Sequence, residues 1–212
     1  MNKAAAKETR RKRTASKRER QEQLILATIR SVASNGLSDT TMATVAREAG
    51  LSQGIINLHF QSKDRLLVET LQYVAEEYRT TWEKALKNAG DSTAEKLAAL
   101  VAVDFRQPVC DRNKLAVWFA FWSESKARPT YRKICAMRDL AYRKEMVLLL
   151  EALIAEGGYK ELDAATVATG LSSMTEGLWL DLLISPRSLS REQAFDVCMN
   201  YLSLAFYDHF EA

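Results

Sequence analysis

The stretch TTMATVAREAGLSQGIINLHFQSK, residues 40–63, decides the fold, because it has the layout of two short helices joined by a tight turn. Ala46 is small enough for a close crossing of two helices. Gly50, four residues later, suits the left-handed conformation that often ends a helix, and Ser52 is the expected N-cap of the next one. The pattern predicts a helix-turn-helix, in which the second helix enters the major groove of DNA. Alanine and glycine at this spacing alone also fit an ordinary helical hairpin.

The two faces of this motif differ in chemistry. The apolar side chains predict the buried side, and they are Val45, Ala49, Leu51 and Ile56. The remaining positions are left for the outward face, and they are Gln53, Gly54, Asn57 and His59. Short polar side chains and a glycine allow close approach to base edges and phosphates, so the outward face suits DNA.

The flanking segments extend the motif to a compact head. Residues 23–35 carry apolar side chains at helical spacing and stop at Asn35-Gly36. A long helix is expected from Ser62 to about Asn88, because Ser62 is a good N-cap and Asp64 places a negative charge in the first turn. We therefore expect three short helices followed by a long one that leads into a body.

Residues 24–68 resemble the DNA-binding head of the tetracycline-repressor (TetR) family of bacterial regulators. The matching positions are Gly36, Thr40-Thr41, Val45-Ala46, Ala49-Gly50-Leu51-Ser52, Gly54, His59-Phe60, Lys63 and Leu66. Leu58 departs from the family pattern, which usually has an aromatic residue two positions before the phenylalanine. The departure removes any phosphate contact that an aromatic hydroxyl would make, and it leaves the packing pattern intact.

The resemblance implies DNA contacts from Thr41, Thr44, Ser52, Gln53, Gly54, Asn57, His59 and Lys63. Thr41 and Lys63 lie at expected helix N-termini, where free backbone amides favour phosphates. Gln53 and Asn57 are the expected base readers, because their amides can pair with an adenine edge. A solvated polar position is the alternative for each of these residues taken singly.

The charge is concentrated at the start of the chain. Residues 1–20 hold nine Lys or Arg and two acids, a net +7, while the whole chain is only +3, so the remaining 192 residues sum to −4. We expect a basic arm that is disordered up to about Arg18 without DNA and that follows the phosphate backbone or enters the minor groove. A solvated tail without specific contacts is the alternative. No apolar segment follows the charges, as a signal peptide would require.

Composition excludes several classes of protein. The hydrophobic fraction is 47%, enough for a core, and no run reaches the length that spans a membrane. The three cysteines, Cys110, Cys135 and Cys198, match no metal or redox motif, which indicates a reducing cytoplasm without disulfides. The chain has two histidines and no glycine-rich phosphate loop, so we expect neither an enzyme nor a metal or cofactor site.

The pattern predicts an all-α fold of about nine helices. We expect an arm of residues 1–20, a helix-turn-helix domain of residues 21–66, and a ligand-binding and dimerisation domain of residues 67–212. The body helices are expected at 91–106, 112–126, 130–156, 163–184 and 190–210, with Ser190 and Gln193 as a capping box for the last.

The last two helices are the expected homodimer interface, because they combine small residues with apolar area. The small residues are Ala164, Ala165, Ala168, Ser172 and Gly177, and the apolar ones are Leu171, Met174, Leu178, Phe195, Tyr201, Leu202 and Phe206. Two such helices from each subunit would form a four-helix bundle about a two-fold axis. Two heads about 34–36 Å apart would then reach successive major-groove faces. Packing within one subunit is the alternative.

Two aromatic segments are the candidate effector site. Trp118 and Trp122 share a helix face, and a later segment contains Glu176 and Trp179. Aromatic faces near carboxylates can hold a quaternary ammonium, although spacing alone favours a plain core. The run 118–122, Arg128-Pro129 after it, and the segment 176–180 resemble the body of the choline-responsive (BetI-type) branch of the TetR family, as does Gly54-Ile55-Ile56 in the head. The resemblance implies an effector pocket lined by Trp118, Phe121, Trp122, Glu124, Glu176 and Trp179.

These features together predict a ligand-responsive repressor. A dimer would bind a near-palindromic operator, and choline or a related quaternary amine would release it. The long helix from Ser62 would connect the two events. The alternative is an architectural helical protein that binds DNA without sequence preference and without an effector.

Overall fold

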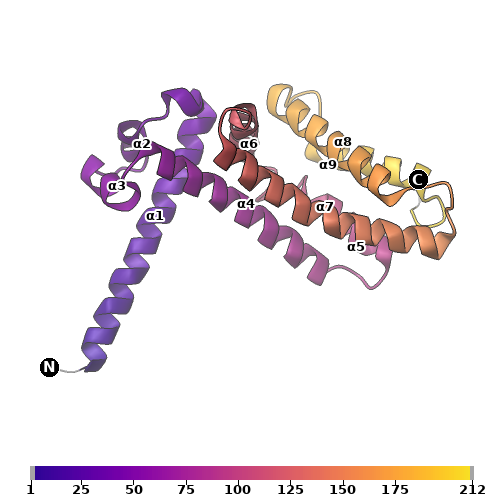
Figure 1. Cartoon of the computed structure of the whole chain (residues 1–212), viewed down its shortest axis with the longest axis horizontal. Helices are drawn as coiled ribbons and strands as arrows, with labels where there is room; N and C mark the ends of the chain where they lie inside the picture. Colours follow the sequence, from indigo (N-terminus) through magenta and orange to yellow (C-terminus); the bar gives the residue numbers. More distant parts are fainter. Residues whose placement is uncertain (1–2, 211–212) are drawn as a thin grey trace. The chain divides into compact units, whose positions relative to one another are not determined.

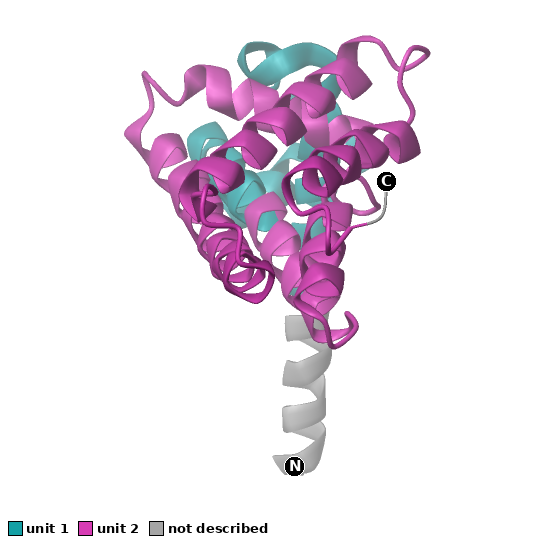
Figure 2. Cartoon of the chain, turned by 90° about the vertical axis from the view of Figure 1, so that its right-hand side faces the viewer, with its two compact units in different colours: residues 1–73 teal, residues 74–212 magenta. Residues whose placement is uncertain are grey.

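The computed structural model describes residues 3–210, and it describes the side chains of residues 17–210. Within residues 3–210 the chain forms nine α-helices and no strand, which confirms the all-α prediction (Figure 1). The chain divides into two compact units, residues 1–73 and residues 74–212 (Figure 2). Most of the basic arm expected over residues 1–20 lies outside the described side chains.

Unit 1 contains α1 (Lys3–Asp39), α2 (Met42–Glu48), α3 (Gln53–Phe60) and the start of α4 (Lys63–Lys87). Gly36 interrupts α1 with a φ of 78°, at the predicted stop signal. The buried Thr40 hydroxyl donates to the Gly36 carbonyl oxygen over 2.8 Å and lies 3.2 Å from the buried Ser31 hydroxyl. These contacts link the end of α1 to the start of α2. The core of the unit includes Leu24, Ile29, Val45, Ile56, Phe60 and Leu66.

Unit 2 contains the rest of α4 together with α5 (Thr93–Val103), α6 (Arg112–Glu124), α7 (Pro129–Gly157), α8 (Ala164–Ile184) and α9 (Arg191–Ala205). Local signals set the helix ends. Ser92 and Ser190 each form a capping box with the residue three positions later, and Gly158 ends α7 with a left-handed φ of 67°. Within the unit, α8 packs against α6, α7 and α9, and α5 packs against α7 and α9.

The last helix is shorter than expected. It ends at Ala205 rather than near Phe210, because Phe206 leaves the helical conformation with φ −126° and ψ 58°. Phe206 and Phe210 are both buried, so the segment after the helix packs its aromatic rings into the unit.

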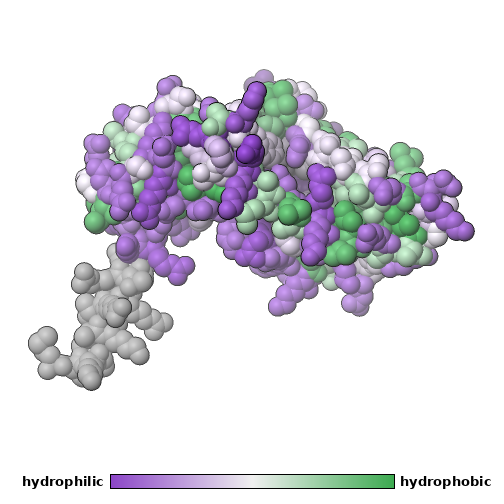
Figure 3. All heavy atoms as spheres, in the orientation of Figure 1, coloured by the Kyte–Doolittle hydropathy of each residue, from purple (hydrophilic) through white to green (hydrophobic). Residues whose placement is uncertain are grey.

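The dimer interface expected on α8 and α9 stays a prediction, but some of the residues named for it do not lie on an outward face. Five of its proposed members are at most 7% exposed in the single chain, namely Ala164, Ala168, Leu171, Leu202 and Phe206. They form the core of unit 2, because helical spacing selects a face without saying whether that face packs within the subunit. The exposed apolar side chains of these two helices are different, and they are Leu180, Ile184, Val197 and Leu204. Figure 3 shows hydrophobic residues in several places on the surface of unit 2, among hydrophilic ones.

Candidate nucleic-acid interface and ligand pocket

The turn between α2 and α3 has the predicted geometry. Gly50 takes a φ of 65°, and its N–H donates to the Arg47 carbonyl oxygen over 3.0 Å. The N–H of Leu51 donates to the carbonyl oxygen of Ala46 over 2.9 Å, which closes the turn. Val45 and Ile56 are fully buried beneath it. These contacts hold α3 in a fixed position relative to α2.

The start of α2 is held by a reciprocal pair of threonines. The Thr41 hydroxyl accepts from the Thr44 N–H over 3.1 Å, and the Thr44 hydroxyl accepts from the Thr41 N–H over 2.8 Å. Thr41 is exposed and Thr44 is half-buried. Both predicted DNA contacts therefore also shape the helix terminus that carries them.

Ser52 takes the N-cap position of α3, but no capping hydrogen bond from its hydroxyl is found in the described part of the chain. The expectation that its side chain caps the helix is therefore wrong. Ser52, Gln53, Gly54 and Asn57 are all exposed along α3. The N-terminal end of this helix consequently presents a hydroxyl, two amides and a bare backbone to solvent.

His59, Lys63 and Leu58 complete this surface. His59 is half-buried, and burial together with the nearby Lys17 lowers its pKa. The Lys63 ammonium donates to the Ser38 carbonyl oxygen over 2.8 Å, which places this charge beside the segment before α2. Leu58, at the position where the family usually has an aromatic residue, is 76% exposed.

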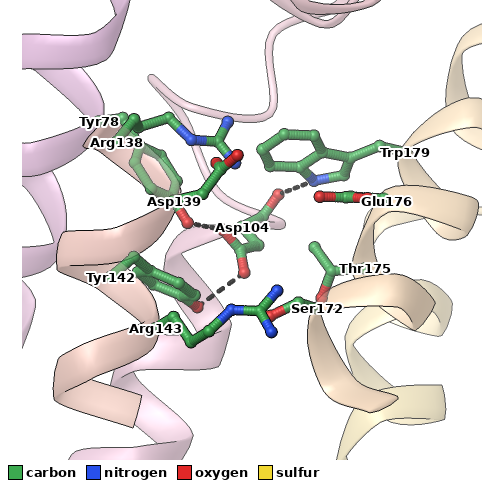
Figure 4. Close-up of a pocket in the computed structure, with 10 residues that line it drawn as sticks. All are labelled: Tyr78, Asp104, Arg138, Asp139, Tyr142, Arg143, Ser172, Thr175, Glu176 and Trp179. Atoms are coloured by element: carbon green, nitrogen blue, oxygen red, sulfur yellow. Dashed lines mark hydrogen bonds and ion pairs between the residues drawn. The ribbon is translucent and has the colours of Figure 1, made fainter. Parts of the chain in front are cut away.

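Unit 2 contains a pocket built around Asp104, which follows α5 and is 2% exposed (Figure 4). The Tyr78 hydroxyl donates to Oδ1 over 2.7 Å, and the Tyr142 hydroxyl donates to Oδ2 over 2.8 Å. The indole Nε1–H of Trp179 donates to the Asp104 carbonyl oxygen over 2.7 Å. Burial raises the pKa of Asp104 to about 6, although the two tyrosines and Arg138 favour its charged form. Asp104 thus joins α4, α5, α7 and α8 through one carboxylate and one carbonyl.

Arg138 of α7 fills the aromatic part of this pocket, and its side chain is 7% exposed. Its guanidinium carbon lies 4.6 Å from the ring centroid of Trp118, 4.7 Å from Tyr78, 5.5 Å from Trp122 and 5.8 Å from Trp179. Nη2 is 2.6 Å from Oδ1 of Asp139. Nε and Nη1 have no hydrogen-bond partner within the described residues. Four rings and one carboxylate therefore surround a buried cation.

The rest of the pocket wall is polar. It consists of Asp139 and Arg143 from α7 and Ser172, Thr175 and Glu176 from α8. Desolvation and the nearby Asp139 raise the pKa of Glu176. The exposed Arg143 donates to the Thr169 hydroxyl over 3.0 Å. With Arg138 in place, the free cavity volume is about 30 Å³, room for about a water molecule.

The structure places two of the six predicted effector residues, Glu176 and Trp179, in the wall of this pocket, and it places Trp118 and Trp122 against the Arg138 guanidinium outside that wall. Trp118 and Trp122 stack with ring centroids 6.0 Å apart, Trp122 and Trp179 stack at 6.4 Å, and Glu176 lines the wall. Phe121 instead packs edge-on against Tyr131 at 4.8 Å. Glu124 is half-buried and does not line the pocket at Asp104.

The polar centre of the pocket was not predicted from the sequence, and it consists of Tyr78, Asp104, Arg138 and Tyr142. Two signals could have indicated it. Asp104 is the lone acid in the apolar run LAALVAVDF, residues 97–105, and Arg138 and Tyr142 are four residues apart on one helix.

A second, more open cavity of about 380 Å³ lies between the start of α6, the end of α8 and the start of α9. It is lined by Gln107, Cys110, Asp111, Arg112, Leu115, Leu182, Pro186, Leu189, Ser190, Arg191 and Glu192. The pocket at Asp104 is the stronger candidate, because it combines buried charges with aromatic faces.

No group of His, Cys, Asp or Glu among the described residues is arranged to hold a metal ion. None of the described helices has the length and apolar character needed to cross a membrane.

Comparison with known proteins covers both units. Residues 24–70 match the family of bacterial regulatory proteins described as the tetR family, and residues 93–206 match the one described as BetI-type transcriptional repressor, C-terminal. The transcriptional regulator BetI of Burkholderia mallei (strain NCTC 10229) is 29% identical over 183 residues, which are 86% of this chain and 91% of that protein.

Solved structures show the same fold. A transcriptional regulator from Pseudomonas aeruginosa PAO1 is 27% identical with a TM-score of 0.77, over 91% of this chain and 93% of that one. A regulator from Saccharomonospora viridis, solved in complex with choline, is 23% identical with a TM-score of 0.78, over 87% of this chain and 96% of that one.

Proposed function

Because the chain belongs to the TetR family of bacterial transcriptional regulators and carries a BetI-type C-terminal domain, we propose that it is a repressor that an organic cation releases from DNA. Its relatives are named as transcriptional regulators, so it is a regulator and not an enzyme. An architectural protein without sequence preference finds no support in these relatives. Because a repressor acts on DNA, we propose that this protein is located in the cytoplasm.

The exposed N-terminal end of α3 carries the DNA-binding part of the proposal. Gln53 and Asn57 read base edges, because each amide offers a donor and an acceptor to one adenine. Gly54 lets the backbone approach the groove, while Ser52, His59 and Lys63 contact phosphates. Thr41 and Thr44 contact phosphate at the start of α2.

The operator is a near-palindrome bound by a homodimer. The dimer forms through the outward faces of α8 and α9, where Leu180, Ile184, Val197 and Leu204 are exposed in the single chain. Two-fold symmetry would then present two copies of α3 to half-sites about 34–36 Å apart.

The effector site is the pocket around Asp104. Trp179 supplies an aromatic face and Glu176 a carboxylate to its wall, and Trp118 and Trp122 supply further aromatic faces around the Arg138 guanidinium. Such a site suits choline or a related amine, because aromatic faces attract cations through their quadrupole. The relative from Saccharomonospora viridis was solved with choline bound. Effector and operator favour different states of the dimer, and only the difference in affinity between those states moves the equilibrium.

A gel shift with DNA flanking the protein's own gene tests the proposal. We expect one retarded species that a scrambled duplex does not compete away, and we expect choline to release it while equal concentrations of sodium chloride do not. Equal competition by scrambled DNA contradicts the specific repressor. Retention of the complex in choline contradicts that effector.

A further inference from the structure

The guanidinium of Arg138 occupies the place that a cationic effector would take. We propose that Arg138 is an internal occupant of the cation site, and that an organic cation binds by displacing it. This inference rests on the proposed effector role of the pocket. It adds a residue that sets how strongly, and how selectively, that pocket binds cations.

The first support is geometric. All four rings around the guanidinium lie within 5.8 Å of its carbon, inside the range of about 6 Å at which a cation is attracted to a ring face. In Figure 4 Arg138 lies between Tyr78 and Trp179. Its Nε and Nη1 have no hydrogen-bond partner among the described residues. The buried guanidinium therefore has the ring faces and the Asp139 carboxylate in place of hydrating water.

The second support is the charge of the pocket. Asp104, Asp139 and Glu176 are its three acids, and Arg138 and Arg143 are its two bases, so the fully ionised pocket carries −1. Without the Arg138 charge it would carry −2. An incoming anion would meet three carboxylates, whereas a cation would restore the charge that Arg138 supplies. The chemistry therefore favours a cation as the replacement.

The third support is space. The free volume of about 30 Å³ cannot hold a small organic cation while Arg138 stays in place. The two cations therefore exclude each other. The apparent affinity for the effector is then the intrinsic affinity multiplied by the fraction of molecules in which Arg138 has left the rings. An ion that interacts weakly with aromatic rings would fail to displace the guanidinium. Arg138 thereby sets a threshold that an effector must exceed.

The test measures binding of tetramethylammonium chloride by tryptophan fluorescence, with sodium chloride at equal ionic strength as the salt control. Arg138→Gln removes the charge and keeps an uncharged side chain. If Arg138 of the wild type is away from the rings in fewer than about one molecule in ten, Arg138→Gln should bind tetramethylammonium at least about tenfold more tightly than the wild type. Arg132→Gln, an exposed arginine on the same helix, is the matched control and should bind like the wild type.

A second measurement is made on the wild type and does not depend on the folding of Arg138→Gln. In the ¹⁵N–¹H spectrum of the wild type, one arginine Nε–H resonance should be shifted strongly upfield by the rings and should move when tetramethylammonium is added. Arg138→Lys assigns this resonance by its absence. An unshifted set of arginine resonances overturns the proposal even if Arg138→Gln fails to fold.

The outcomes separate this inference from the proposed function. Equal tetramethylammonium affinity in wild type and Arg138→Gln overturns the internal occupant and leaves the effector pocket in place. Binding by neither protein overturns both, while a gel shift on the same samples still tests operator binding. Binding of sodium acetate that Arg138→Gln abolishes overturns the inference and makes the pocket an anion site.

Discussion

Replacing Asp104 with Asn should remove a large pH dependence of folding stability. Burial raises the pKa of Asp104 from 3.8 to about 6, a change of about 2 units, and each unit corresponds to about 1.4 kcal/mol. Below about pH 4 the carboxyl is protonated in both the folded and the unfolded chain. Between about pH 4 and 6 the folded chain keeps the proton and the unfolded chain releases it, so stability falls as pH rises. The predicted loss is about 3 kcal/mol, and it levels off above about pH 6.

Urea unfolding at pH 4, 5, 6 and 7 measures this effect as a difference between two proteins. The free energy of unfolding of the wild type minus that of Asp104→Asn should decline by about 2.5 kcal/mol from pH 4 to pH 7, because other titrating groups cancel and the rest of the loss lies below pH 4. Asp196→Asn, an exposed aspartate on α9, is the control and should show no such decline. A flat difference between wild type and Asp104→Asn would refute the account of a buried, desolvated carboxylate held by Tyr78, Tyr142 and Arg138.

The remaining predictions concern the head and the dimer. Gly50→Ala should destabilise the protein by about 1–2 kcal/mol in urea unfolding, because its φ of 65° strains an L-residue although the added Cβ would meet nothing within 4 Å. Gly54→Ala should leave folding intact or stabilise it by about 0.5–1 kcal/mol and still weaken operator binding; unchanged binding would remove Gly54 from the interface. Gln53→Ala should change the preferred base at its position, whereas Lys63→Ala should weaken all duplexes alike; equal losses for Gln53→Ala on every duplex count against base reading. Leu204→Asp should make the protein monomeric in light scattering at micromolar concentration, and a persistent dimer would exclude this face.

The head could be predicted in detail because its signals are local. The stop at Gly36, the left-handed Gly50 and the exposed positions of α3 follow from the conformations that each residue allows within a few neighbours. The capping boxes at Ser92 and Ser190 are local in the same sense. Ser52 shows the limit of such local prediction. It stands at the N-cap position of α3, but its hydroxyl does not make the capping hydrogen bond among the residues that the structure describes.

The pocket was only half predictable, because its members meet through packing between distant helices. The tryptophan pair Trp118 and Trp122 was visible from helical spacing, but nothing in that spacing indicates that Asp104 and Arg138 join them. Phe121 illustrates the reverse case, since it neighbours the pair in sequence yet packs against Tyr131. The small and apolar residues of α8 and α9 likewise have a helical pattern that core and interface share.

The central claim is that an organic cation and the operator each weaken the binding of the other to the same dimer. The most direct measurement is the dissociation constant of choline, by isothermal titration, for the free protein and for the protein saturated with operator DNA. The account predicts that operator weakens choline binding by about 5- to 150-fold, and that choline weakens operator binding by the same factor. The same choline affinity in the presence and absence of operator would contradict it.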